Sequence, residues 1–81
     1  MGYVASVNVM LKDGIADPQG QTIERALPAL GFDGVSGVRV GKRIELHVDA
    51  ADPTDARRKV AEMCERLLAN PVIESFEVDV S

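Results

Sequence analysis

Cysteine, histidine and aromatic side chains are scarce in this sequence. It has one cysteine (Cys64), one histidine (His47), no tryptophan, one tyrosine and two phenylalanines. A lone cysteine excludes a disulfide framework and a CxxC metal site, and a lone histidine leaves no second imidazole for a metal centre. The few aromatics also argue against an RNA-recognition domain, which stacks bases on aromatic side chains of its central strands.

Positive charge and long apolar runs are scarce as well. Nine Lys and Arg residues stand against thirteen Asp and Glu residues, which gives a net charge of −4. An acidic chain binds nucleic acid poorly, and no apolar run is long enough to cross a bilayer. We therefore expect no nucleic-acid or membrane partner. The lone cysteine and the lack of a signal peptide favour a cytoplasmic location.

The short chain limits the size of the core. Its 81 residues are expected to form one domain, 1–81. A chain of this size buries only roughly 60% of its unfolded surface on folding. Because no disulfide supplements the small core, we expect the protein to self-associate.

Hydrophobic periodicity predicts a strand and then a helix in the first half. Residues 3–11 alternate between apolar and polar side chains, as in a half-buried strand. In DPQGQTIERALPALG (17–31), an Asp-Pro pair is suited to start a helix and Gly31 to end it. Pro28 falls inside this helix and predicts a kink or a tightened last turn. The apolar stripe of the helix is Ile23, Ala26, Leu27 and Leu30.

The second half predicts a hairpin, a helix and a last strand. VSGVRVGKRIELHVD (35–49) is interpreted as two strands, and the loop between them is expected to be odd in length or to carry a bulge, with Gly41 supplying the backbone freedom. A second Asp-Pro pair at 52–53 opens a helix that Asn70, in a left-handed conformation, and Pro71 are expected to end. The apolar stripe of this helix is Ala56, Val60, Met63, Cys64, Leu67 and Leu68, and residues 72–80 alternate again.

The element order is therefore β-α-β-β-α-β. This order predicts an α+β, ferredoxin-like fold, in which two helices cover one face of a four-stranded antiparallel sheet.

No group of side chains is typical of a catalytic or metal centre. Asp17, Asp52 and Asp55 are explained by the helix starts, and Cys64 lies within an apolar stripe, where a buried structural thiol is expected. Arg39, Lys42 and Arg43 form one basic cluster at the predicted hairpin turn. It is open to three interpretations: a phosphate site, a solvated turn, or a contact with an acidic partner.

Four segments span nearly the whole chain: DPQG (17–20), ALPALGF (26–32), VRVGK (38–42) and MCERLLANPVIE (63–74). In this order and spacing they resemble the PurS family, the small subunits of phosphoribosylformylglycinamidine (FGAM) synthase. The sequence departs from the family in Ile15-Ala16, where a Val-Leu pair is common, and in Pro28.

The resemblance implies a role in purine biosynthesis within an ATP-dependent, glutamine-using ligase. In such a complex a PurQ-like glutaminase releases ammonia and a PurL-like synthetase uses it, with ATP and Mg²⁺ bound by the synthetase. A PurS-like chain would bridge the two, help ammonia pass, bind no cofactor itself, contribute no catalytic residue, and form a homodimer or homotetramer.

Candidate partner contacts come from the same motifs. They are Asp17, Pro18, Gln19, Gly20, Arg39, Gly41, Lys42, Arg43, Asn70 and Pro71. DPQG either presents a helix start to a partner or only caps the helix. The alternative function is a small-molecule-sensing, ACT-like regulatory domain, for which the loop KDGIAD (12–17) offers a weak signal. A standalone enzyme is disfavoured, because no polar constellation is present.

Overall fold

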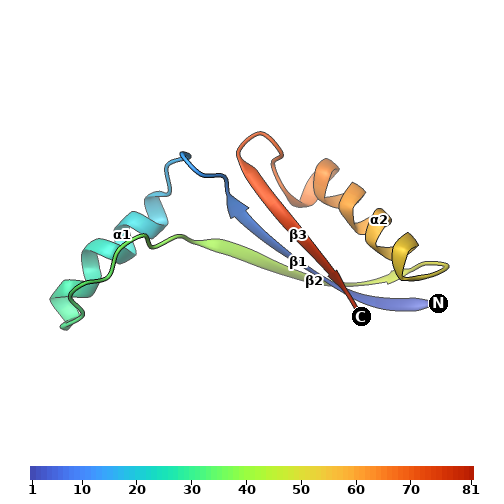
Figure 1. Cartoon of the computed structure of the whole chain (residues 1–81), viewed down its shortest axis with the longest axis horizontal. Helices are drawn as coiled ribbons and strands as arrows, with labels where there is room; N and C mark the ends of the chain where they lie inside the picture. Colours follow the sequence, from blue (N-terminus) through green and yellow to red (C-terminus); the bar gives the residue numbers. More distant parts are fainter.

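The computed structural model describes residues 1–81 as a small sheet domain and an arm that projects from it (Figure 1). The elements are β1 (Gly2–Leu11), α1 (Pro18–Ala26), the 3₁₀ turn η1 (Leu27–Leu30), β2 (Gly41–Asp49), α2 (Pro53–Met63), the π-helical turn η2 (Cys64–Leu68) and β3 (Glu74–Val80). The three strands form one antiparallel sheet in the order β2-β1-β3. We call this sheet with α2 the body, and residues 15–40 the arm.

The core of the body lies between the sheet and α2. The predicted alternation of β1 is confirmed, because Ala5, Val7 and Val9 are fully buried. Val7 is the central residue of the sheet, paired with Ile44 of β2 and Val78 of β3. The remaining buried apolar residues are Val48, Ala50, Ala56, Val60, Cys64 and Ala69. No residue larger than valine or cysteine is fully buried, so the core is small.

The predicted start and end of α1 are confirmed. Asp17 caps the helix and accepts a hydrogen bond from the backbone N–H of Gly20. The chain leaves the helix at Gly31, whose φ of 94° is left-handed. Pro28 lacks an N–H for the α-helical bond, and the last turn, Leu27–Leu30, is accordingly a tighter 3₁₀ turn.

Helix α2 begins as predicted but ends differently. Asp52 caps it by accepting from the N–H of Asp55 over 2.7 Å. A left-handed Asn70 is wrong, because no residue other than glycine has a positive φ. The helix instead widens into a π-helical turn, in which the N–H of Ala69 donates to the carbonyl of Cys64, and Ala69 is already extended. The chain therefore leaves the helix through the π turn and an extended Ala69, with no left-handed residue.

The four-stranded, ferredoxin-like sheet is wrong, because the predicted central hairpin does not exist. Residues 38–40 run straight into β2 and join no sheet. Gly41 is not among the glycines with positive φ. Gly41 is instead the first residue of β2 and pairs with Met10 of β1 in the sheet register. A glycine required for close backbone approach had the sequence signature of a turn glycine.

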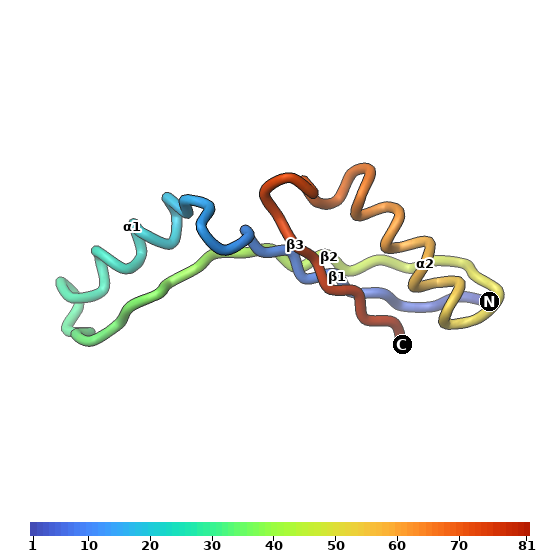
Figure 2. The backbone as a smooth tube through the Cα atoms, turned by 45° about the horizontal axis from the view of Figure 1, so that its top comes forward, coloured from blue at the N-terminus to red at the C-terminus, as the bar shows by residue number.

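The prediction that both helices cover one face of the sheet is also wrong. Helix α2 packs on the sheet, whereas α1 points away from it, and residues 31–40 run back beside α1 toward the body (Figures 1 and 2). The molecule measures 51 × 25 × 15 Å. Its radius of gyration is 16.2 Å, against about 12 Å for a compact chain of this length. The arm is therefore a helix and an extended strand without a layer to pack on.

Candidate interaction site at the base of the arm

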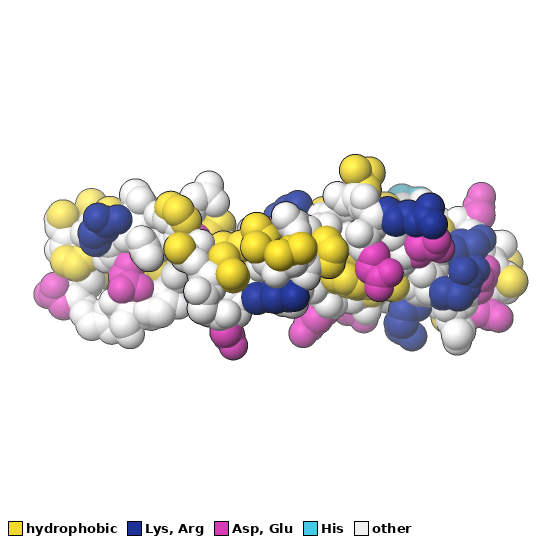
Figure 3. Space-filling view, turned by 90° about the horizontal axis from the view of Figure 1, so that it is seen from above, with side chains coloured by type: hydrophobic (Ala, Val, Ile, Leu, Met, Phe, Trp, Pro, Cys, Tyr) yellow, Lys and Arg dark blue, Asp and Glu magenta, His cyan; other side chains and the backbone are white.

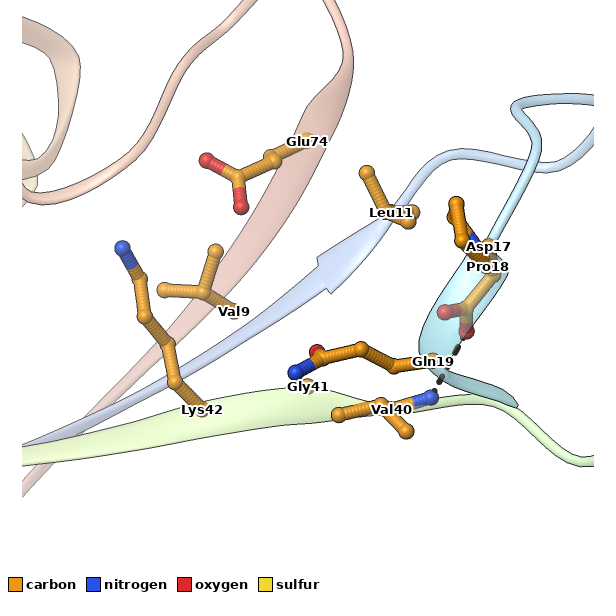
Figure 4. A pocket seen from close by; sticks show the side chains of 9 residues that line it. All are labelled: Val9, Leu11, Asp17, Pro18, Gln19, Val40, Gly41, Lys42 and Glu74. Atoms are coloured by element: carbon orange, nitrogen blue, oxygen red, sulfur yellow. Dashed lines mark hydrogen bonds between the residues drawn. The ribbon is translucent and has the colours of Figure 1, made fainter. Parts of the chain in front are cut away.

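The DPQG and VRVGK motifs meet where the arm joins the body. Between them lies an open cleft of about 280 Å³ (Figure 4). Its lining comes from β1, the start of α1, the start of β2 and the start of β3: Val9, Leu11, Asp17, Pro18, Gln19, Val40, Gly41, Lys42 and Glu74. Five of the predicted contact residues are thus brought together: Asp17, Pro18, Gln19, Gly41 and Lys42.

Asp17 holds the two motifs together. Its Oδ1 accepts from the N–H of Gly20 over 2.9 Å, and its Oδ2 accepts from the N–H of Val40 over 2.8 Å. The hydrogen bonds from Gly20 and Val40, with a smaller contribution from the charge of Arg39, lower the pKa of this carboxyl group. Asp17 therefore does more than cap the helix, because it also fixes the point at which the arm strand enters β2.

Glu24 repeats this contact one step further along the arm. Its Oε1 accepts from the N–H of Val38 over 2.9 Å. Asp17 and Glu24 are seven residues apart, so they lie on one face of α1. Two carboxylates of the helix thus bind two alternate N–H groups of the extended segment, in place of a neighbouring strand.

Gly20 allows the helix and the strand to approach this closely. It is the only buried residue of α1. A methyl group at Gly20 would overlap with the carbonyl oxygen of Val38 and stand 2.7 Å from Oδ2 of Asp17. At Gly41 a methyl group would overlap with the sulfur of Met10 and stand 2.5 Å from the carbonyl oxygen of Val9. Both glycines of the candidate list are explained by backbone contact.

Lys42 and Glu74 carry opposite charges on the two sides of the cleft. Figure 4 shows Lys42 extending from β2 beside Val9, and Glu74 extending from β3 above it. Lys42 pairs with Val9 in the register, and Glu74 pairs with Leu11. Both charged side chains therefore stand on the face of the sheet that carries the apolar core.

Arg39 has a structural contact that the hairpin interpretation did not predict. Its guanidinium donates to the carbonyl oxygen of Leu11 and lies 3.3 Å from Oδ1 of Asp13. It joins the arm strand to the end of β1, so it is not a free charge at a turn.

Arg43 is separated from Lys42 by the sheet. Successive residues of a strand point to opposite faces. Arg43 therefore lies on the outer face, 3.2 Å from Oε1 of Glu45, with its side chain largely exposed. The predicted basic cluster is thus wrong, because its three members face three different environments.

Asn70 and Pro71 lie in the connection between η2 and β3. Oδ1 of Asn70 accepts from the N–H of Val72, and its backbone N–H donates to Glu74. The carbonyl of Pro71 accepts from Nζ of Lys12 over 2.7 Å. This loop is therefore fixed to the end of β1, close to the base of the arm.

Sequence reasoning missed Lys12, Glu24 and Glu74 as parts of this junction. For Glu24 the sequence offers no signal. For the side on which Lys42 stands a signal exists, because the apolar alternation of 38–48 continues unbroken through residues 38, 40, 44, 46 and 48 only if Lys42 shares their face. Read as one strand, the sequence places a lysine on the core side.

The remaining reactive groups lie apart from the cleft. Cys64 is fully buried against the sheet, and burial, followed by the charge of Glu65, raises the pKa of its thiol. His47 is exposed on the outer face of β2. No group of three or more His, Cys, Asp or Glu side chains is arranged to hold a metal ion. None of the helices has the length and apolar character needed to span a membrane.

Comparison with known proteins gives a match along the whole chain. The family "PurS: Phosphoribosylformylglycinamidine (FGAM) synthase" matches residues 4–81. The FGAM synthase subunit PurS of Methanocaldococcus jannaschii is 42% identical over 96% of this chain and 94% of its own length. The same subunit of Mycobacterium leprae is 50% identical over 91% of this chain and 90% of its own length.

Solved structures agree with the sequence match. The crystal structure of the M. jannaschii PurS superimposes with a TM-score of 0.87 over 98% of this chain and 95% of that one. A chain in the structure of PurLQS from Thermotoga maritima is 36% identical, with a TM-score of 0.89 over 100% of this chain and 99% of that one.

The fold and the junction define a small α+β protein with a projecting arm, and the comparisons show its family. This chain belongs to the PurS family, and it is a subunit of phosphoribosylformylglycinamidine synthase, an enzyme of purine biosynthesis.

Proposed function

We propose that this chain is a non-catalytic bridging subunit, which holds a PurL-like synthetase and a PurQ-like glutaminase together and assists the transfer of ammonia between them. The observation that carries the proposal is the arm. A helix and a strand project from a small body and expose apolar side chains, among them Leu30 and Phe32. A surface of this kind is an interaction surface, because soluble monomers rarely leave large apolar patches open.

A relative supports the choice of partners. The T. maritima chain that resembles this one over its whole length is part of a PurLQS structure. By this resemblance the partners are PurL-like and PurQ-like chains, and the ATP and Mg²⁺ of the reaction belong to the synthetase. A cytoplasmic location stays a prediction. The contacts predicted at the arm base, at Arg43 and at Asn70–Pro71 also stay predictions.

Self-association is part of the proposal, as a homodimer or homotetramer. Only ten of 81 residues are buried in the single chain. A chain with so small a core and an uncovered helix gains stability by packing on a partner.

Bridging has a chemical reason. Ammonia in neutral water is mostly ammonium, which is not a nucleophile. A subunit that holds two active sites in register and excludes water between them preserves the reactive form without supplying an acid or a base.

The test is reconstitution with the PurL-like and PurQ-like chains of the same organism. In sedimentation, the PurL-like and PurQ-like chains should migrate together as a stable complex only when this chain is added. A complex of the two large chains that forms equally well without it would contradict the proposal. Calorimetry with free amino acids is the companion measurement, because saturable binding at the cleft would favour an ACT-like sensor instead.

A further inference from the structure

Strand β3 has a free edge. The sheet order is β2-β1-β3, so β3 is paired on one side only. Val4 and Ser81 exchange two backbone hydrogen bonds, of 3.1 and 2.9 Å. Because such pairs alternate along an antiparallel ladder, Glu77 and Asp79 also turn their backbone groups toward β1. The residues beside them therefore point their N–H and C=O groups to the open side, where the chain offers no partner: Phe76, Val78 and Val80.

The outer face of this edge is acidic. Glu77 and Asp79 alternate with the apolar residues of β3, so their side chains lie on the face opposite α2, where they are exposed. Neither side chain has an ion-pair partner. They stand beside Asn8 and Ser6 of β1, and the guanidinium of Arg43 lies beyond β1, on β2. Two unpaired carboxylates therefore border the open edge.

The inner face of the edge is apolar. Phe76, Val78 and Val80 pack against the core but stay partly exposed. Apolar side chains continue at the start of the strand, because Val72 and Ile73 directly precede it and Val72 is 78% exposed. Figure 3 shows hydrophobic side chains gathered across the middle of the molecule, between the arm and α2. A strand added at β3 would therefore cover apolar side chains as well as backbone groups.

Charge decides what kind of chain fits this edge. A second copy of β3, paired antiparallel along its length, would set carboxylates of the two copies opposite each other, and like charges in that position destabilise a strand pair. Charged side chains protect free edges against such pairing. A segment with basic side chains opposite Glu77 and Asp79 gains cross-strand ion pairs instead. The acidic edge therefore selects against a second copy and for a basic strand.

We infer that β3 is the docking edge for an extended segment of one of the two large chains, in which basic and apolar residues alternate. The backbone of the segment pairs with Phe76, Val78 and Val80. Its basic side chains stand opposite Glu77 and Asp79, and its apolar side chains continue the inner face. The three-stranded sheet thereby gains a fourth strand from another protein. The inference rests on the bridging function proposed above and names the surface and the chemistry of one contact.

The test is amide hydrogen exchange of this chain alone and in the reconstituted complex with the PurL-like and PurQ-like chains. Exchange is quenched at set times and measured residue by residue by mass spectrometry. In the chain alone, the amides of Phe76, Val78 and Val80 should exchange faster than those of Glu77 and Asp79, which point to β1. In the complex, the three outward amides should exchange at least about tenfold more slowly than in the chain alone.

Charge reversal tests the chemistry of the segment. Glu77→Lys combined with Asp79→Lys should remove this protection and weaken binding to the large chains at least about tenfold, because like charges then face each other. Asp49→Lys, on β2 at the opposite edge of the sheet, is the matched control and should change neither. Circular dichroism checks that each variant is folded. If the double variant does not fold, the exchange measurement on the wild-type chain still decides.

The outcomes separate this inference from the proposed function. A stable complex in which the three outward amides exchange as fast as in the chain alone would overturn edge docking and leave bridging standing. Amides that are already protected in the chain alone would assign the edge to a second copy and overturn the inference. Full protection in a complex of the charge-reversed chain would overturn the basic segment. If no complex forms, the proposed function fails, and this inference fails with it.

Discussion

Replacing Gly20 by alanine gives a test in which helix propensity and the observed packing predict opposite signs. Alanine is favoured over glycine in a helix by up to about 1 kcal/mol. In this structure, however, the new methyl group overlaps with the backbone carbonyl of Val38, which cannot rotate away as a side chain would. The arm strand must then move off the helix.

The expected loss is worked out from the contacts that this movement breaks. Overpacking a close contact costs about 1–3 kcal/mol. Separating the strand from the helix also removes the hydrogen bond from Val38 to Glu24, worth about 1 kcal/mol. After subtraction of the gain in propensity, Gly20→Ala should lower the free energy of unfolding by about 1–3 kcal/mol.

Urea unfolding followed by circular dichroism, at one fixed protein concentration, measures this change, because the stability of a self-associating protein depends on concentration. Gln21→Ala, on the exposed side of the same turn, should change the stability by less than about 0.5 kcal/mol. Glu24→Ala should cost less in the Gly20→Ala protein than in the wild type, because the hydrogen bond is already lost. A Gly20→Ala protein as stable as the wild type or more so would refute the reasoning.

Three further predictions concern a thiol, a carboxyl group and a surface charge. Because Cys64 is buried with a raised pKa, it should react slowly with thiol reagents until urea unfolds the chain, and fast labelling of the native protein would contradict this. Cys64→Ser should lower the free energy of unfolding by about 1–3 kcal/mol. The hydrogen bond from Arg58, with that from Ala51, lowers the pKa of Asp55 to about 2. The stability from this group is therefore complete above its unfolded pKa of about 3.9 and lost as the pH falls toward 2. The thermal stability of Asp55→Asn should depend less steeply on pH in this range than that of the wild type. An equally steep dependence would contradict the prediction. Arg43→Glu, on the outer face of the sheet, should lower glutamine-dependent product formation more than Arg57→Glu on α2; equal effects would remove Arg43 from the contact surface.

Local structure was predictable where one signal dominates. The two Asp-Pro helix starts, Gly31 at the end of the arm helix and the tightened turn at Pro28 depend on steric and hydrogen-bonding rules that act within a few residues. The alternation of β1 depends on one buried face and is equally local.

The architecture was less predictable, because it depends on contacts between residues far apart in the sequence. The stripe of α1 indicates that the helix is covered but does not say by which chain. Gly41 has one sequence signature for two roles, a turn or a close backbone approach, and the sheet register with Met10 decides between them. The binding of Val38 and Val40 by Glu24 and Asp17 uses side chains far from them in sequence, so no local pattern announces it.

The most direct test of the bridging role compares two nitrogen sources in the reconstituted enzyme. The PurL-like and PurQ-like chains are assayed with and without this chain, once with glutamine and once with a high concentration of ammonium salt. If the chain organises the delivery of ammonia, leaving it out should lower the glutamine-dependent rate at least tenfold and the ammonium-dependent rate much less. Equal losses in both rates would place its role at the synthetase site, and no loss in either would contradict a bridging role.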